Sequence, residues 1–215
     1  MQITHLGHSA VLVEVADRRI LFDPGNFSDA WHGLTDLDAV LVTHQHPDHV
    51  DPAAVPALLA ANPGAQVHVE PQVLDVVDLP GATPLAADSS VDLGGGVRVE
   101  AVGGWHAVIH ADIPRIGNVG LVLSAPGEPT LFHPGDSLAT IPSGIDVLAI
   151  PAYGPWAAMK ETIDFVRAVG APQGFLIHEG LLGPRGWKLA YDRLGGMGPS
   201  ALVDLRDGSP WTPGN

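Results

Sequence analysis

The sequence predicts an α/β fold in which two β-sheets pack face to face and helices cover their outer surfaces, a four-layer αβ/βα sandwich. In the first half of the chain, short apolar runs bounded by Gly, Pro and Asp come before helical patterns. The second half repeats that order without any detectable sequence repeat. No linker-like or low-complexity stretch interrupts the 215 residues, so we expect a single domain that spans residues 1–215.

The first half opens with three expected strands at residues 2–6, 10–15 and 19–22, separated by turns and arranged as an antiparallel meander. The apolar run 39–42 predicts a fourth, buried strand. Asp51 and Pro52 then form a helix start, because a capping carboxylate precedes a proline at the first helical position. That helix should continue over 53–61, followed by a short strand at 66–69 and a short helix at 71–77.

The second half contains two expected strand pairs, at residues 90–93 with 97–102 and at 118–123 with 130–132. Apolar runs at 147–150 and 175–177 predict two further buried strands. Between them, residues 156–169 have helical periodicity, with Met159, Ile163, Phe165 and Val166 as the apolar positions. From residue 209 onward the chain is expected to be a loose tail.

Composition excludes several classes of function. The 24 acidic and 10 basic residues give a net charge of −14, which disfavours nucleic acid as a partner. The chain has no cysteine, so any metal must be held by histidine and carboxylate rather than by thiolate. Neither a signal peptide nor an apolar run of membrane-spanning length is present, so we expect a cytoplasmic protein with no membrane partner.

The run from His44 to His49 reads His-Gln-His-Pro-Asp-His and directly follows the strand expected at residues 39–42. His44 and His46 lie at i and i+2, so they can point the same way from an extended segment. Pro47 forces a turn, so Asp48 and His49 should face a second point close to the first. This arrangement indicates a two-metal site, in which the ions lie about 3.5–4 Å apart.

One strand end cannot complete two coordination spheres, so further ligands should come from other strand ends. His106, Asp136 and His178 come after the apolar strands expected to end at residues 102, 132 and 177. They are therefore the further candidate ligands. His110 is a rival for the place of His106, and Asp136 follows Pro-Gly, where an aspartate can simply be a turn residue.

The His-x-His-x-Asp-His motif, followed in order by His106, Asp136 and His178, resembles the metallo-β-lactamase superfamily over essentially the full chain. Gly-His-Ser-Ala at residues 7–10 and Asp-Pro at 23–24 resemble its branch containing L-ascorbate-6-phosphate lactonase. The resemblance implies the metallo-β-lactamase fold with Asp136 as a bridging ligand. It also implies one ion on His44, His46 and His106, and a second ion on Asp48, His49 and His178.

This resemblance implies a dinuclear metal-dependent hydrolase, in which a hydroxide bridging two divalent ions attacks a small ester, lactone or phosphoester. Zinc is the expected ion, with manganese or iron as alternatives. Asp48 is the expected catalytic residue, because it can orient the nucleophile or take its proton. The alternatives are a phosphodiesterase or nuclease acting on nucleotides, and a non-catalytic metal-binding member of the fold.

Four further side chains are candidate contacts for a small-molecule substrate: His8, His110, Tyr153 and Lys160. His8 follows a glycine turn and could equally have a structural role. Lys160 could be a solvated charge of the helix expected at 156–169, and Trp156 could be a core residue. The substrate itself and the oligomeric state stay open, because specificity depends on loops whose shape the sequence does not give.

Overall fold

The first sheet is formed by the first half of the chain in a computed structural model that describes residues 1–214. Its six strands lie in chain order: β1 (Gln2–His5), β2 (Val11–Val15), β3 (Arg18–Phe22), β4 (Ala39–Val42), β5 (Gln66–Val69) and β6 (Thr83–Pro84). The first three strands pair antiparallel, and β3 to β6 pair in parallel. Helix α1 (Val55–Ala61) connects β4 to β5 and packs on this sheet through Val55 and Leu58.

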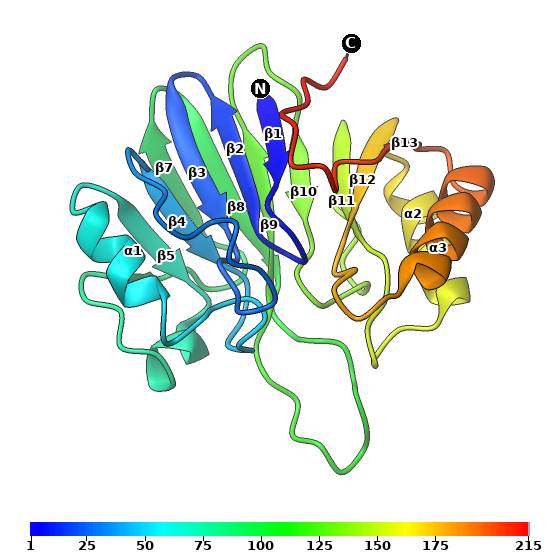
Figure 1. Ribbon diagram of the computed structural model, residues 1–215, viewed down its shortest axis with the longest axis horizontal. Helices are drawn as coiled ribbons and strands as arrows, with labels where there is room; N and C mark the ends of the chain where they lie inside the picture. The colour runs from blue at the N-terminus through cyan, green and yellow to red at the C-terminus, as the bar shows by residue number, and fades with distance from the viewer. Residues whose placement is uncertain (215) are drawn as a thin grey trace.

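The second sheet is formed by the second half of the chain. Its seven strands lie in the order β13 (Ala201–Val203), β12 (Gln173–Ile177), β11 (Val147–Pro151), β10 (Leu131–His133), β9 (Val119–Ser124), β8 (Val97–Gly103) and β7 (Ser90–Gly94). Helices α2 (Met159–Val169) and α3 (Pro184–Met197) lie on its outer face, opposite α1 (Figure 1). The predicted four-layer α/β sandwich is therefore confirmed.

Alternation along the strands explains why the layers stack in this way, because successive strand residues point to opposite faces of a sheet. In β2, Val11 and Val13 belong to the buried cluster between the two sheets, which also contains Phe175 of β12. Leu12, between them in sequence, belongs to the cluster under α1, together with Leu58. The apolar residues of each sheet are thus divided between an inner core and an outer core.

Helix α3 and strand β13 were not predicted from the sequence. Helix α3 contains Gly186 and Gly195, and glycine disfavours a helix by about 1 kcal/mol relative to alanine. Its buried residues are Trp187, Ala190 and Leu194, at spacings of three and four, and they join the core on the outer face of the second sheet. Tertiary packing therefore stabilises a helix that local propensity does not favour.

Element ends differ from the predictions by a few residues. Helix α1 begins at Val55, after a turn in which Asp51 accepts hydrogen bonds from the amides of Ala53 and Ala54. Helix α2 begins at Met159, since the chain before it forms a bridge between Gly154 and Ala157. The short helix expected at 71–77 is a 3-10 helix over Pro71–Asp75.

The expected loose tail is wrong for residue 211. The backbone N–H and C=O of Trp211 pair with those of Ile3, which fixes this segment beside β1; Asn215 lies outside the described residues.

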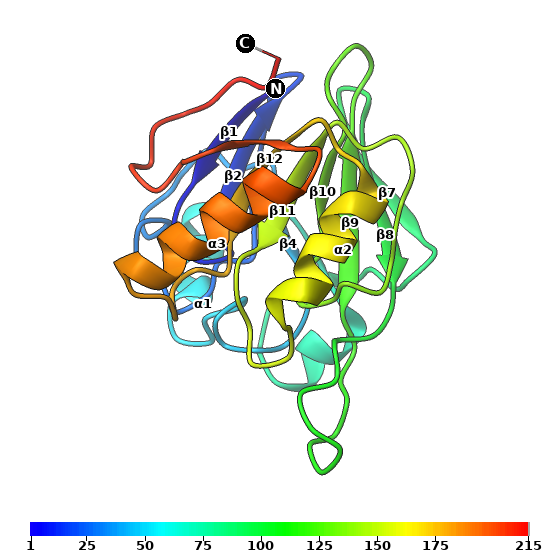
Figure 2. The ribbon, with the colours of Figure 1, turned by 90° about the vertical axis from the view of Figure 1, so that its right-hand side faces the viewer.

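The loop between β8 and β9 projects away from the body of the molecule (Figures 1 and 2). Within residues 1–214, no helix is long and apolar enough to cross a membrane. The single domain and the cytoplasmic location stay predictions.

Candidate metal centre

Eight side chains that follow strands of both sheets gather into two groups. Within each group, one potential ligand atom per residue lies within 4.8 Å of the others. The first group contains His44, His46, His106 and Asp136, and the second contains His8, Asp48, His49 and His178. The structure therefore brings together all seven predicted ligands, and it divides the run from His44 to His49 at Pro47, as the sequence indicated.

Asp136 lies between the two groups. Its Oδ1 is 3.1 Å from Nε2 of His49, and its Oδ2 is 3.1 Å from Nε2 of His178, both in the second group. The same Oδ2 is 3.4 Å from Nε2 of His106 and 3.9 Å from Nε2 of His44, both in the first group. A single buried carboxylate therefore contacts imidazoles of both groups.

The outward nitrogens of His106 and His178 are tied to backbone carbonyls. Nδ1 of His106 lies 2.6 Å from the carbonyl of Ala107, and Nδ1 of His178 lies 2.5 Å from the carbonyl of Tyr153. Because a carbonyl only accepts, each Nδ1 carries a proton, and in the neutral ring each Nε2 presents its lone pair to the centre. Nε2 has no hydrogen-bond partner in either ring among residues 1–214, although both side chains are buried.

Asp23 and Thr43 orient two further imidazoles. The Thr43 hydroxyl donates to Oδ2 of Asp23 at 2.7 Å, so it can only accept from Nδ1 of His44, 3.0 Å away. Nδ1 of His49 donates to the same Asp23 oxygen at 2.6 Å. Sequence reasoning did not include Asp23 in the site, although it follows β3 in the way that ligands follow other strands.

These contacts fit a pair of bound cations. Four imidazoles have Nδ1 held from outside, so that Nε2 faces the centre, and outer partners of this kind are typical of metal-ligating histidines. Nδ1 of His46 also lies 3.1 Å from Nε2 of His44, so the two rings converge on one point. Buried lone pairs without donors are unfavourable unless a cation satisfies them.

The electrostatics of the centre keep its carboxylates ionised and divide its imidazoles into two kinds. Burial would lower the pKa of His49 and His178, but the charge of Asp136 raises both, that of His49 well above its ordinary value. Burial lowers the pKa of His44 well below its ordinary value, and the nearby charge of His49 lowers it further. Burial alone would raise the pKa of Asp48, but a hydrogen bond from His8 and the charge of His49 lower it to about 2. Burial would also raise the pKa of Asp136, whereas the charges of His49 and His178 hold it well below its ordinary range.

We expect Thr43→Val to weaken metal binding about 10–100-fold, the range typical for loss of an outer partner of a ligand. Valine has the shape of threonine but cannot accept from Nδ1 of His44 or donate to Asp23. Isothermal titration of the metal-free protein with zinc measures the change. Thr43→Ser keeps the hydroxyl and is the matched control. Equal affinities for the Val and Ser variants would contradict this role.

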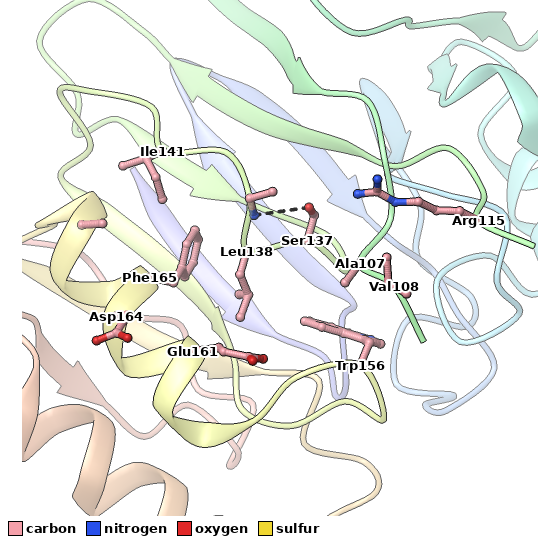
Figure 3. Close-up of a pocket in the computed structure, with 12 residues that line it drawn as sticks. Ala107, Val108, Arg115, Ser137, Leu138, Ile141, Trp156, Glu161, Asp164 and Phe165 are labelled. Carbon is pink, nitrogen blue, oxygen red and sulfur yellow. Dashed lines mark hydrogen bonds between the residues drawn. The ribbon is translucent and has the colours of Figure 1, made fainter. Parts of the chain in front are cut away.

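Trp156 connects the centre to a neighbouring groove. Its indole N–H donates to Oδ2 of Asp136 at 2.9 Å, so this residue is more than the core residue that the sequence suggested. The groove has a volume of about 500 Å³ and is lined mainly by apolar side chains, including Trp156, Leu138 and Phe165 (Figure 3). Arg115 also lines the groove and donates from Nε to the carbonyl of His106 at 2.6 Å.

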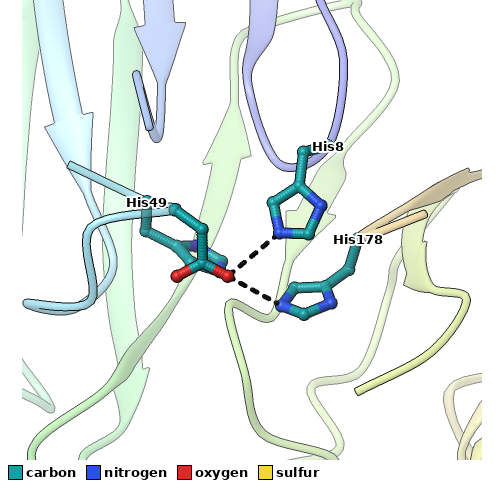
Figure 4. A group of neighbouring side chains, drawn as sticks. His8, His49 and His178 are labelled. Atoms are coloured by element: carbon teal, nitrogen blue, oxygen red, sulfur yellow. Dashed lines mark hydrogen bonds and ion pairs between the residues drawn. The ribbon is translucent and has the colours of Figure 1, made fainter. Parts of the chain in front are cut away.

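The four predicted substrate contacts lie in different places. His8 is buried within the second group, with Nε2 3.1 Å from Oδ2 of Asp48 (Figure 4). The Tyr153 side chain is exposed, and it is the backbone carbonyl of this residue that reaches His178. His110 lies exposed on the loop between β8 and β9, and Lys160 is exposed in α2. Neither residue joins a group, and their contacts with substrate stay predictions.

Residues 2–173 match the family model described as the β-lactamase superfamily domain. With the sandwich fold and the paired His and Asp groups already in place, this match shows that the chain belongs to the metallo-β-lactamase superfamily. The chain is 42% identical over 195 residues to the protein named Rv0786c of Mycobacterium tuberculosis. The matched residues cover 90% of this chain and 91% of that protein.

A second relative is a UPF0173 metal-dependent hydrolase of Xanthobacter autotrophicus. It is 33% identical over 155 residues, which cover 64% of this chain and 62% of that protein. Among solved structures, the metallo-β-lactamase fold protein YhfI of Bacillus subtilis is similar with a TM-score of 0.72. That similarity covers 98% of both chains at 16% sequence identity, so it supports the fold alone.

Proposed function

We propose that this protein, a metal-dependent hydrolase of the superfamily, is a dinuclear enzyme. The observation that carries this proposal is the buried carboxylate of Asp136, which contacts imidazoles of both groups. One ion would be held by His44, His46 and His106, and the second by Asp48, His49 and His178, with Asp136 reaching both. Nitrogen and oxygen ligands without thiolate suit zinc, and also manganese or iron.

Divalent ions held there would lower the pKa of bound water toward neutrality and polarise a carbonyl or phosphoryl oxygen of the substrate. Asp48, with a pKa of about 2, stays ionised at neutral pH and can accept a hydrogen bond from the attacking water. The indole of Trp156 fixes one oxygen of Asp136. These side chains can therefore orient a nucleophile within a mostly buried centre.

For the substrate, we propose a small ester, lactone or phosphoester whose apolar part lies in the groove beside Trp156. The groove is next to the centre: Trp156, which lines it, contacts Asp136, and Ala107 and Ser137, which also line it, directly follow His106 and Asp136. Arg115 is positioned to contact an oxygen-rich or anionic group at its edge. The lactonase-like branch suggested by the sequence stays a prediction within this class.

We expect the purified chain to bind two divalent ions after removal of metal and reconstitution with zinc. Asp136 contacts both groups, and each group supplies enough nitrogen and oxygen ligands for one ion. Elemental analysis by inductively coupled plasma mass spectrometry gives the stoichiometry per chain. A reconstituted protein with one ion, or with none, would contradict the dinuclear centre.

The function itself is tested by offering lactones, carboxyl esters and phosphodiesters to zinc-loaded and manganese-loaded protein. We expect hydrolysis of at least one class, lost on chelation and restored by the ion. Turnover that survives complete removal of metal would contradict a metal-dependent reaction. A preference for phosphodiesters would favour the nucleotide alternative over lactones and carboxyl esters.

A further inference from the structure

Both ring nitrogens of His8 make hydrogen bonds. Nδ1 accepts a hydrogen bond from the backbone N–H of Gly180 at 3.1 Å. An amide nitrogen can only donate, so Nδ1 presents its lone pair there, and the proton of the neutral ring resides on Nε2. Nε2 lies 3.1 Å from Oδ2 of Asp48, which can only accept. Among the neutral rings of the second group, His8 is thus the one whose inward nitrogen is a donor.

The ring of His8 has little freedom to adopt another position. Its side chain is 1% exposed and lies between Phe27, with ring centroids 4.7 Å apart, and His178, with centroids 4.2 Å apart. A Cβ atom at Gly180 would lie 2.9 Å from Nδ1 of His8, closer than side chains normally approach. The absence of a side chain at Gly180 therefore lets its amide approach the ring.

The backbone of His8 is held in a strained conformation. Its φ of 52° lies in the left-handed region that non-glycine residues rarely adopt. Its N–H donates to Oε1 of Glu179 at 2.9 Å, and its carbonyl accepts from the amide of His178 and from Nε2 of His5, each at 2.9 Å. A strained backbone conformation that is held by this many surrounding contacts is typical of functional positions.

We propose that His8 is a positioning residue that donates Nε2–H to Asp48 and is not itself a metal ligand. This proposal rests on the proposed metal centre. The proximity of His8 to Asp48, His49 and His178 does not by itself distinguish a metal ligand from a hydrogen-bond donor. With His8 as a donor, Asp48, His49, His178 and the shared Asp136 would be the residues that hold the second ion. Catalytic metal sites keep a coordination position open for water or substrate, and a further ligand from His8 would fill it.

Two substitutions separate a donor from a ligand. Glutamine places its Nε2 amide nitrogen, which donates but does not bind metal, close to the position of the His8 Nε2 atom. Alanine removes the donor, and both variants keep a Cβ atom in the same backbone conformation. Stepwise zinc titration of each metal-free variant gives the affinities of the first and second ions. Thermal unfolding of the same samples confirms that they are folded.

We expect His8→Ala to weaken binding of one ion about 10–100-fold and to leave the other within about threefold, as for loss of an outer partner of one ligand. His8→Gln should restore that affinity to within about threefold of wild type. Its cobalt(II)-substituted absorption spectrum should also match wild type, because the coordination sphere is unchanged. If His8→Ala fails to fold, the affinity and spectrum of His8→Gln still decide the question.

Equal losses in the Gln and Ala variants, or a changed cobalt spectrum in His8→Gln, would show that His8 is a ligand and would overturn the proposal. Unchanged affinity in His8→Ala would overturn it as well. In the zinc-loaded wild type, long-range proton–nitrogen NMR should find the ring proton of His8 on Nε2, and a proton on Nδ1 would contradict the donor role. A wild-type chain that takes up no ion would instead defeat the proposed metal centre, and this role with it.

Discussion

Asp136→Asn should lower turnover more than about 100-fold and remove tight binding of the second ion, because a shared ligand contributes more than an outer partner. Asparagine keeps an acceptor for the indole of Trp156, so the neighbouring side chains can stay in place. It lacks the negative charge that the surrounding imidazoles contact. The loss should therefore follow from charge and coordination rather than from unfolding.

The measurement combines zinc titration with turnover on whichever substrate class the protein hydrolyses. Asp136→Ala should behave in the same way, with a further loss of about 1–3 kcal/mol of stability, because the buried Trp156 N–H loses its acceptor. Asp192→Asn is the matched control, since Asp192 is an exposed α3 residue paired with Lys188. Turnover of Asp136→Asn close to wild type would refute a bridging role.

Gly25→Ala should lower the free energy of unfolding by at least about 3 kcal/mol, at the upper end for a clash in a packed region. A Cβ atom at Gly25 would overlap the carbonyl group of Asp48 and crowd the amide of His49. The clashing atoms belong to backbone, which cannot move aside as a flexible side chain can. The loop that holds the ligands must then shift, so metal binding should weaken as well.

Chemical denaturation of the metal-free variant, followed by zinc titration, checks both effects. Gly64→Ala is the control: this glycine also lies in a turn, and a Cβ atom there would meet nothing within 4 Å. We expect its stability to change by no more than about 0.5 kcal/mol. Equal stability of the Gly25 and Gly64 variants would show that the loop around Gly25 has more room than the structure indicates.

The sequence predicted the layers and marked the residues that the structure brings together, because both leave local patterns. Apolar runs marked the buried strands, and His106, Asp136 and His178 each followed such a run. Helix α3 left a weaker pattern, because its glycines oppose the helix that Trp187 and Leu194 stabilise by packing. Prediction succeeded where the signal lies within about ten neighbouring residues.

The contacts that orient the ligands could not be predicted because they join distant parts of the chain. His8 and Gly180 are 172 positions apart, and their contact depends on a backbone amide that no residue pattern marks. His178 likewise meets the backbone carbonyl of Tyr153, although the sequence suggested only the Tyr153 side chain. Asp23 left a detectable signal, since it follows a strand, but only the fold brings it to Thr43 and His49.

Each sheet supplies only some of the candidate ligands of the centre. His44, His46, Asp48 and His49 follow a strand of the first sheet, whereas His106, Asp136 and His178 follow strands of the second. Ions bound at this junction would hold the two halves together. They would add about 4 kcal/mol to the free energy of unfolding when the concentration of free ion is a thousandfold above the dissociation constant. Neither half-chain alone carries a complete ligand set, so the centre exists only when both halves fold together.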